Sequence, residues 1–305
     1  MSRRGWLLFI ALGVIWGIPY LLIKVAVREF TPASLVFLRT ALGAAILFPV
    51  MVWRGDLRAV LARWRPIALF TVVEMAIPWL LLSHAELRVT SSLAGLFMAS
   101  VPLVGAALAR LTGGHEPLGA RRVLGLLVGL AGVVALLGLD LGRGDVPAIL
   151  ALGIVALGYA IGPMIIARRL ADLPVLDVVA ASLALCAVAY APVGLAQLPA
   201  RMPAAEVVGA VVVLGVACTA VAFLLFFRLI AEVGPVRATV ITYVNPAVAV
   251  AAGVSLLGEP FTLGTASGFV LILAGSWMAT GGSSAQPAPG EKDELAEPAA
   301  RPREA

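Results

Sequence analysis

The sequence is dominated by apolar segments of about 20 residues, the length that a helix needs to cross a bilayer. Between these segments lie charged residues, Pro or Gly, which mark their ends. We predict ten transmembrane helices, at positions 6–26, 32–53, 66–84, 90–110, 119–139, 147–167, 174–195, 206–227, 236–257 and 262–280. The pattern therefore predicts an all-α integral membrane protein with short loops.

The composition excludes water as the main solvent of the fold. Hydrophobic residues make up 61% of the 305 residues and charged residues only 13%, whereas soluble domains carry about 25% charged and 45–50% apolar residues. The last segment, 281–305, is instead rich in Pro, Ala and Glu. We expect it to be a disordered tail, because it has too few apolar side chains to form a core.

An internal repeat divides the chain into two halves. Glu116-Pro117 begins the pattern E-P-x7-G-x5-A-G, and the same pattern begins again at Glu259-Pro260, 143 residues later. The same offset aligns Pro49-Val50 with Pro192-Val193. We predict two five-helix repeats, at 1–140 and 141–280.

Five helices are an odd number, so the second repeat enters the membrane from the opposite side and the repeats are inverted. Ten helices place both termini on one side, and cytoplasmic loops are usually the ones rich in Lys and Arg. Placing the termini in the cytoplasm leaves only Lys24, Arg28, Arg88, Arg143 and Arg201 on the other side. The cytoplasmic side then holds the three basic residues of the tail and Arg3, Arg4, Arg54, Arg58, Arg63, Arg65, Arg110, Arg121, Arg122, Arg168, Arg169, Arg228 and Arg237. We therefore expect both termini in the cytoplasm.

Inverted repeats are characteristic of transporters, because two similar halves of opposite orientation can exchange conformations around a central site. Prolines within the predicted helices offer breaks for such a site, since each removes a backbone hydrogen bond. We expect breaks at Pro19, Pro102, Pro163 and Pro246. The alternative for each proline is an ordinary kink that neighbouring helices tolerate.

These motifs resemble those of the EamA-type transporters of the drug/metabolite transporter superfamily. The resemblance covers residues 6–280 and rests on Trp16-Gly17, Arg39, Ser100-Val101-Pro102, Glu116-Pro117 and Gly258-Glu259-Pro260. It implies a ten-helix carrier of the inner membrane with a central cavity, an exporter or permease of amino acids, nucleotide-like metabolites or other small organic molecules. It implies neither an ATP motor nor a bound metal, and we expect no cofactor. The second half departs from the pattern, because Ser182 stands where Arg39 stands in the first.

Only two charged residues lie clearly away from the ends of the predicted helices, in the membrane interior, where a charge costs at least about 2.5 kcal/mol. Glu74 is central in its span, and a carboxyl in a low-dielectric site can load and release a proton near neutral pH. Glu74 is therefore a candidate for proton coupling or for binding a cationic group of the substrate. Arg39 stays charged and must pair with Glu74, with backbone carbonyls or with a substrate anion. The simplest hypothesis is an Arg39–Glu74 pair with which a substrate anion competes. Ala217 aligns with Glu74 in the second half. A structural ion pair or a hydrogen-bonded, protonated carboxyl is the alternative.

Aromatic and amide residues near the expected breaks form a second group of candidates. Trp16, Tyr159, Tyr243 and Asn245 favour a cavity, where a ring packs on substrate and a polar tip stays wet. For Tyr20 and Trp79 we favour ordinary helix packing or an interfacial position. Asn245 has a further alternative, which is to bond the backbone that Pro246 frees.

The repeated Glu-Pro motif is interpreted as structural. Pro at the first turn and an acidic residue beside it favour the start of a helix, so Glu116 and Glu259 are expected to have structural roles. The glycines that follow let helices approach closely, either between the halves or between two copies in a homodimer. They are Gly125, Gly129, Gly132, Gly268 and Gly275.

Several function classes find little support in the sequence. Cys186 and Cys218 lie in apolar segments without a CxxC spacing, and the two His residues are far apart, so neither a disulfide nor a metal site is expected. The basic residues form no stripe for nucleic acid. A membrane enzyme would need a catalytic motif, and none is present. A small-molecule substrate and the lipid bilayer are the expected partners, and an enzyme or a channel without gradient coupling is the alternative.

Overall fold

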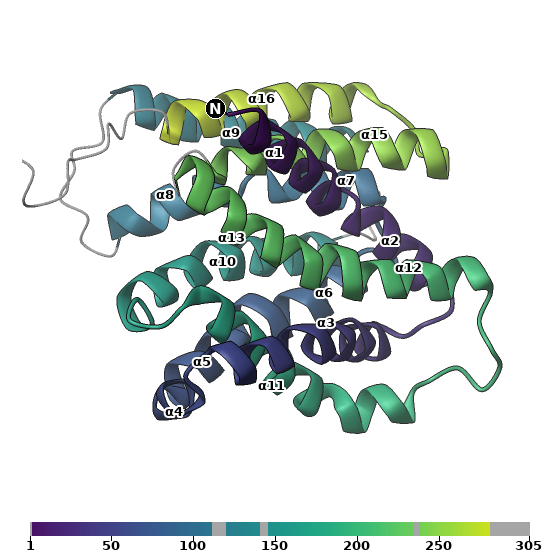
Figure 1. The fold of residues 1–305 in the computed structure, drawn as a ribbon. Coiled ribbons are helices and arrows are strands. Elements are labelled where there is room, and N and C mark those ends of the chain that lie inside the picture. Colours follow the sequence, from purple (N-terminus) through teal and green to yellow (C-terminus); the bar gives the residue numbers. More distant parts are fainter. Residues whose placement is uncertain (1, 112–119, 141–145, 235–237, 281–305) are drawn as a thin grey trace, which may run out of the picture.

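The computed structural model describes residues 2–111, 120–140, 146–234 and 238–280, and within these ranges the chain forms helices and no strands (Figure 1). Glu116 and the tail lie outside these ranges. Three stretches depart from α-helix: the π-helices η1 (Thr71–Ala76) and η2 (Val216–Val221) and the 3₁₀ helix η3 (Thr239–Tyr243). The α-helices are α1 (Arg3–Gly17), α2 (Pro19–Ala26), α3 (Pro32–Arg54), α4 (Leu57–Ala62), α5 (Trp64–Phe70), α6 (Ile77–Ala85), α7 (Ser91–Met98), α8 (Val101–Leu111), α9 (Ala120–Asp140), α10 (Val146–Arg169), α11 (Val175–Ala196), α12 (Ala205–Gly215), α13 (Ala222–Val233), α15 (Asn245–Leu257) and α16 (Leu263–Thr280).

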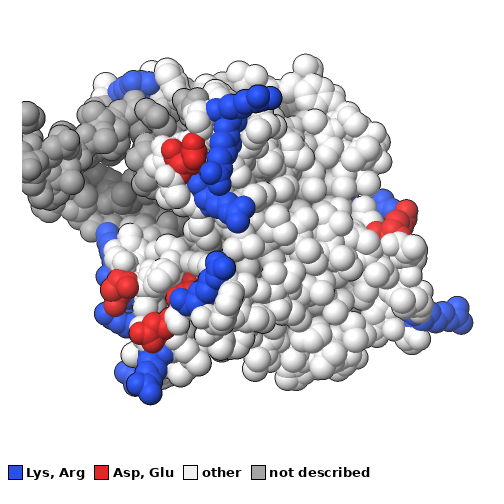
Figure 2. All heavy atoms as spheres, viewed as in Figure 1, with Lys and Arg blue, Asp and Glu red and all other residues white. Residues whose placement is uncertain are grey.

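Seven helical stretches are long and apolar enough to cross a membrane, among them Trp64–Ala85 and Ala205–Val233. Three shorter apolar helices, Val123–Ala135, Ile241–Leu257 and Leu263–Met278, occupy the three other predicted positions. Figure 2 shows charged side chains toward the two edges of the view and a broad uncharged surface between them. Large apolar side chains such as Trp53 and Leu263 are exposed on the surface. Such a surface suits the hydrocarbon of a bilayer.

Three of the expected helix breaks are present. α1 ends at Gly17 and α2 begins at Pro19, and the fourth span of the first half divides into α7 and α8 at Ala99 and Ser100. In the second half, η3 gives way to α15 at Val244. Each break places a proline in the first turn of the next helix, where its missing N–H costs nothing.

The expected break at Pro163 is wrong. α10 runs from Val146 to Arg169 without interruption, and Pro163 lies inside it with an exposed side chain. A continuous helix tolerates a proline where neighbouring groups satisfy the backbone that it frees. The ring of Pro163 points away from the protein core.

Corresponding elements of the two halves pack against each other: α3 against α11, α7 against α15, and α9 against α16. At the last of these pairs the helices meet through glycines. A Cβ atom on Gly275 would overlap the backbone nitrogen of Gly129. Gly125, Gly132 and Gly268 are also buried. The glycine motif thus joins the two halves within one chain.

Candidate functional site

Arg39 lies at the junction of the two halves. It belongs to α3, and only 8% of its surface is exposed. Its guanidinium carbon lies 3.8 Å from the ring centroid of Trp79 on α6, a cation–π geometry. On its other side, Nε donates a hydrogen bond of 3.0 Å to Oγ1 of Thr219, which belongs to η2 of the second half. An aromatic face and a hydroxyl therefore hold this buried cation.

Arg39 and Glu74 do not form the ion pair that we expected. Within the described residues neither of them has an oppositely charged partner within 4.0 Å. Oε2 of Glu74 is buried there without a hydrogen-bond partner. The Glu74 carboxylate lies instead against Gly162 of α10, where a Cβ atom would overlap it. The two charged groups thus occupy separate places.

The third span of each half contains a six-residue π-helix, η1 in the first and η2 in the second. Glu74 is the fourth residue of η1, and Thr219 is the fourth residue of η2. The structural counterpart of Glu74 is therefore Thr219 and not Ala217, because the repeat offset shifts by two residues in this region. π-helical turns occur frequently at functional sites, and here each one supplies a polar residue to the interior.

Two tyrosines complete a central cluster, which we define as Tyr20, Arg39, Trp79, Tyr159 and Thr219. Both tyrosines lie within electrostatic range of the Arg39 guanidinium and of each other. Tyr159 is also in range of Glu74. Tyr20 and Trp79, which we expected to serve packing or an interfacial position, lie in this cluster.

Trp16 lies outside the central cluster. Its ring packs on Phe223 and Phe226 of α13, at centroid distances of 5.7 and 4.9 Å. These contacts join the first span of one half to the third span of the other.

Tyr243 and Asn245 lie at the break before α15. The Tyr243 hydroxyl donates to the Ser276 carbonyl at 3.3 Å, and the Ser276 hydroxyl donates to the Ala99 carbonyl at 2.9 Å. The backbone carbonyl beside the α7–α8 break is therefore bonded by α16. Asn245 Oδ1 is buried without a hydrogen-bond partner among the described residues, so no bond to the backbone freed by Pro246 is seen from this oxygen.

Glu259 has a structural role, but not the one inferred from its motif. Its carboxylate accepts four hydrogen bonds of 2.5 to 3.0 Å from the backbone N–H groups and hydroxyls of Ser91 and Ser92. These serines begin α7, so Glu259 caps a helix of the first half. An acidic group at a helix N-terminus is favourable, because the first N–H groups lack partners there.

Three residues of this interior were not singled out by their sequence: Thr219, Lys24 and Glu86. Thr219 follows an alanine and a cysteine in an apolar segment, and a hydroxyl there carries no distinctive signal. Lys24 and Glu86 lie near the ends of predicted spans, where charges are ordinary. The one signal for Glu86 in the sequence is its position as the acidic residue next to the short turn between two spans.

Known proteins share this arrangement of two helical halves. A model of the EamA-like transporter family matches residues 3–138 and again residues 146–281. The chain is 30% identical over 260 residues to a protein of Escherichia coli K12 described as "Uncharacterized inner membrane transporter YedA", covering 82% of this chain and 81% of the relative. The same protein of Escherichia coli O157:H7 matches equally well. A solved structure titled "Crystal structure of protein" has a TM-score of 0.65 at 24% identity, over 92% of this chain and 97% of the other.

The chain belongs to the EamA-like transporter family. It is a membrane transporter built from two copies of the family's repeat, and its E. coli relative is an inner-membrane protein.

Proposed function

We propose that the protein is a secondary active transporter, an exporter or permease of small organic metabolites such as amino acids or drugs, and that it binds an anionic group of its substrate at Arg39. The observation that carries this proposal is the position of Arg39, a buried cation between the two halves with no acidic partner among the described residues.

The remaining hydrogen-bonding capacity of Arg39 suits an anion. Of the guanidinium nitrogens, only Nε has a hydrogen-bond partner within the described part of the chain. The two terminal nitrogens can donate side by side to a carboxylate or phosphate, the arrangement in which Arg binds anions most strongly. Trp79 holds the guanidinium plane from one face, which orients it before substrate arrives.

Glu74 is the proposed proton carrier. Its Oε2 is buried without a hydrogen-bond partner in the described structure, and a carboxyl in such a place is more stable when protonated. Because Glu74 does not pair with Arg39, substrate need not displace it. Proton and substrate then occupy separate sites, and alternating exposure of both sites to the two sides couples them.

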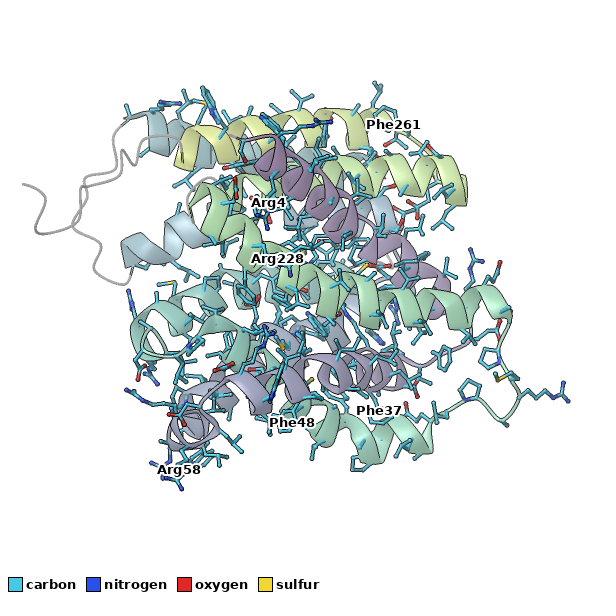
Figure 3. The ribbon with its side chains drawn as sticks, in the orientation of Figure 1. Arg4, Phe37, Phe48, Arg58, Arg228 and Phe261 are labelled. Atoms are coloured by element: carbon cyan, nitrogen blue, oxygen red, sulfur yellow. The ribbon has the colours of Figure 1, made fainter. Side chains whose placement is uncertain are left out.

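The membrane arrangement belongs to the same proposal. All ten predicted segments cross the bilayer as two inverted repeats, both termini lie in the cytoplasm, and a homodimer remains one possible assembly. Figure 2 supports the orientation, since it shows more Lys and Arg side chains in the left part of the view than at the right-hand edge. In Figure 3, Arg58 lies at the left-hand end, whereas Phe261 lies toward the right. A concentration of arginines at one end is what the positive-inside rule expects of the cytoplasmic side.

The test begins with ligand-induced thermal stabilisation in detergent, screened over amino acids, nucleotides and cationic drugs. The strongest ligand is then used, radiolabelled, in proteoliposomes. We expect saturable counterflow and accumulation driven by a pH gradient. Glu74→Gln should abolish the accumulation driven by the gradient and retain counterflow, because substrate still binds at Arg39.

A matched control is Glu206→Gln, which neutralises an exposed carboxylate at the start of α12. It should behave as the unmodified protein. Undiminished accumulation in Glu74→Gln would remove Glu74 from the mechanism. Flux without saturation or counterflow would indicate a channel, and chemical conversion of the ligand would indicate an enzyme.

A further inference from the structure

A second buried carboxyl lies away from Glu74. Glu86 follows α6 directly, one residue beyond the span Trp64–Ala85, and its exposed fraction is 0%. Within the described chain, neither of its carboxylate oxygens has a hydrogen-bond partner. Burying an ionised carboxylate without hydrogen-bond donors costs far more free energy than burying a neutral carboxyl group. The position of Glu86 therefore requires an explanation.

The nearest cation does not satisfy the Glu86 carboxylate. Lys24, from α2, donates to the backbone carbonyls of Glu86 and Val89 at 2.6 and 2.7 Å. The ammonium group thus holds the turn between α6 and α7 by its backbone. No ion pair between Lys24 and Glu86 lies within 4.0 Å in the described structure.

Several charged and titratable side chains surround Glu86. Lys24, Glu259 and Arg39 are within electrostatic range of its carboxyl. Tyr20 and Tyr159 of the central cluster are also in range. These five residues come from α2, α3, α10 and the segment before α16. Glu86 therefore connects the central cluster to the end of the protein where Glu259 caps α7.

The contact of Glu259 with α7 closes that end of the protein. Gly253 of α15 lies against it, and a Cβ atom there would overlap both the Glu259 carboxylate and the Ser92 hydroxyl. Gly258 ends α15 in the left-handed region with φ of 66°, and this turn directs the chain toward α7. In Figure 1 this is the right-hand end, where α2 ends and α15 leads into α16.

We propose that Glu86 is a second proton-binding site, which holds a proton while this end is closed and, on releasing it to water, loosens the contact of Glu259 with α7. A Glu86 carboxylate would repel the Glu259 carboxylate and attract the Lys24 ammonium away from the two backbone carbonyls. Both effects act on the start of α7. The role as a transport gate rests on the proposed function, and under the proposed orientation the gate faces away from the cytoplasm.

The direction of the pH dependence follows from burial. Burial raises the pKa of the Glu86 carboxyl well above its ordinary value, and Lys24 opposes this shift only in part. An opened end would hydrate Glu86 and return its pKa toward the ordinary range. The closed form then binds the proton more tightly, so it is favoured at low pH and loses that advantage as the pH rises from the ordinary carboxyl range toward the raised value.

Hydrogen–deuterium exchange of the whole protein in lipid nanodiscs tests this directly and needs no substrate. Exchange of peptides from 86–98 is followed over a pH series and corrected for the intrinsic pH dependence of exchange. We expect corrected exchange to become faster toward the alkaline end, tenfold for each unit by which the pKa of Glu86 in the closed form exceeds that in the open form. Glu86→Gln should keep exchange slow at every pH.

Two further variants make the result decisive. Gly253→Ala displaces the Glu259 carboxylate, so the peptides from 86–98 of this variant should exchange fast at every pH. That result would show that these amides report the contact of Glu259 with α7. Glu29→Gln neutralises an exposed carboxylate in the turn after α2 and should keep the pH dependence of the unmodified protein.

A Glu86→Gln variant with unchanged pH dependence would overturn the proposal, as would the absence of any pH dependence in the unmodified protein. Either of these outcomes would reject the role of Glu86 and would not affect the proposal of transport through Arg39 and Glu74. A positive exchange result with no transport would instead establish a proton-sensitive closure and reject the proposed function.

Discussion

The two halves of the protein share a backbone plan and differ in their charges. Each half has a π-helix in its third span and a break in its fourth, and corresponding helices pack together. The ionisable residues of the interior belong mainly to the first half, which supplies Arg39, Glu74 and Glu86. The second half contributes Thr219, which accepts a hydrogen bond from Arg39, and Gly162, which lies against the Glu74 carboxylate. Duplication thus preserved the architecture, whereas the chemistry came from divergence.

The residue at each equivalent position shows how the divergence works. Ser182 occupies the place of Arg39, and its hydroxyl is fully buried without a partner in the described structure. Keeping charges in one half avoids placing two like charges in the same interior, which a low-dielectric site would penalise.

The largest expected effect comes from replacing Arg39 of the first half by serine, the residue at the equivalent position of the second half. Arg39→Ser should weaken binding of an anionic ligand by about 10 to 100-fold, because hydrogen bonds to a charged group contribute about 1.5 to 3 kcal/mol. Titration calorimetry in detergent measures this. Arg228→Ser, on an exposed position of α13, should leave affinity unchanged. Equal affinity of the Arg39 variant and the unmodified protein would place the anion elsewhere.

The contact between Glu74 and α10 is tested by adding one methyl group. Gly162→Ala should lower the free energy of unfolding by about 1 to 3 kcal/mol, because the new Cβ overlaps the Glu74 carboxylate. Gly153 lies on the same helix with open space at its Cβ position, so Gly153→Ala should be neutral or stabilising. Thermal unfolding in detergent compares the two, and equal melting temperatures would contradict the contact.

The bond that joins the halves at Arg39 is expected to have a smaller effect. Thr219→Val removes the acceptor of the Arg39 Nε group and should cost about 1.5 kcal/mol, since Trp79 still holds the guanidinium. Thr219→Ser keeps the hydroxyl and should retain most of the stability. Denaturant unfolding of both variants measures the free energy of unfolding. If Thr219→Ser lost as much stability as Thr219→Val, the effect would come from packing and not from the hydrogen bond.

The smallest expected effect concerns the turn that positions Glu259. Gly258→Ala should cost about 1 kcal/mol, because a φ of 66° disfavours any residue with a Cβ atom. Open space surrounds this position, so the cost is one of backbone conformation. Gly209→Ala, in a helical position with equally open space, is the control and should not destabilise. Unchanged melting of Gly258→Ala would show that the turn can relax.

Much of the fold could be predicted, because a bilayer limits the chain to apolar helices of a defined length and a repeat in the sequence reveals the halves. The breaks beside Pro19, Pro102 and Pro246 follow from the missing N–H of proline. Pro163 shows the limit of this reasoning, since a proline whose ring faces outward is carried within a continuous helix. The number of crossing helices and the inverted orientation stay predictions.

The candidate site was harder to predict. Composition alone marked Arg39 and Glu74 as costly charges in the membrane, but their separation depends on how helices rotate and pack. A shift of two residues at the π-helices moved the counterpart of Glu74 from Ala217 to Thr219, and no constant offset could show that. Aromatic residues could not be sorted either, because Trp16 and Trp79 look alike in sequence and only one of them lies beside Arg39.

The sequence by itself determined the solvent, the helical class and the two repeats, and it marked Arg39 and Glu74 as interior charges, because hydrophobicity, length and periodicity act locally along the chain. Only the tertiary structure decided which groups meet: Arg39 with Trp79 and Thr219, Glu74 with Gly162, and Glu259 with the start of α7. The reason is physical. A buried polar group is satisfied by whatever donor or acceptor the packing brings within about 3 Å, and residues far apart in the chain provide it.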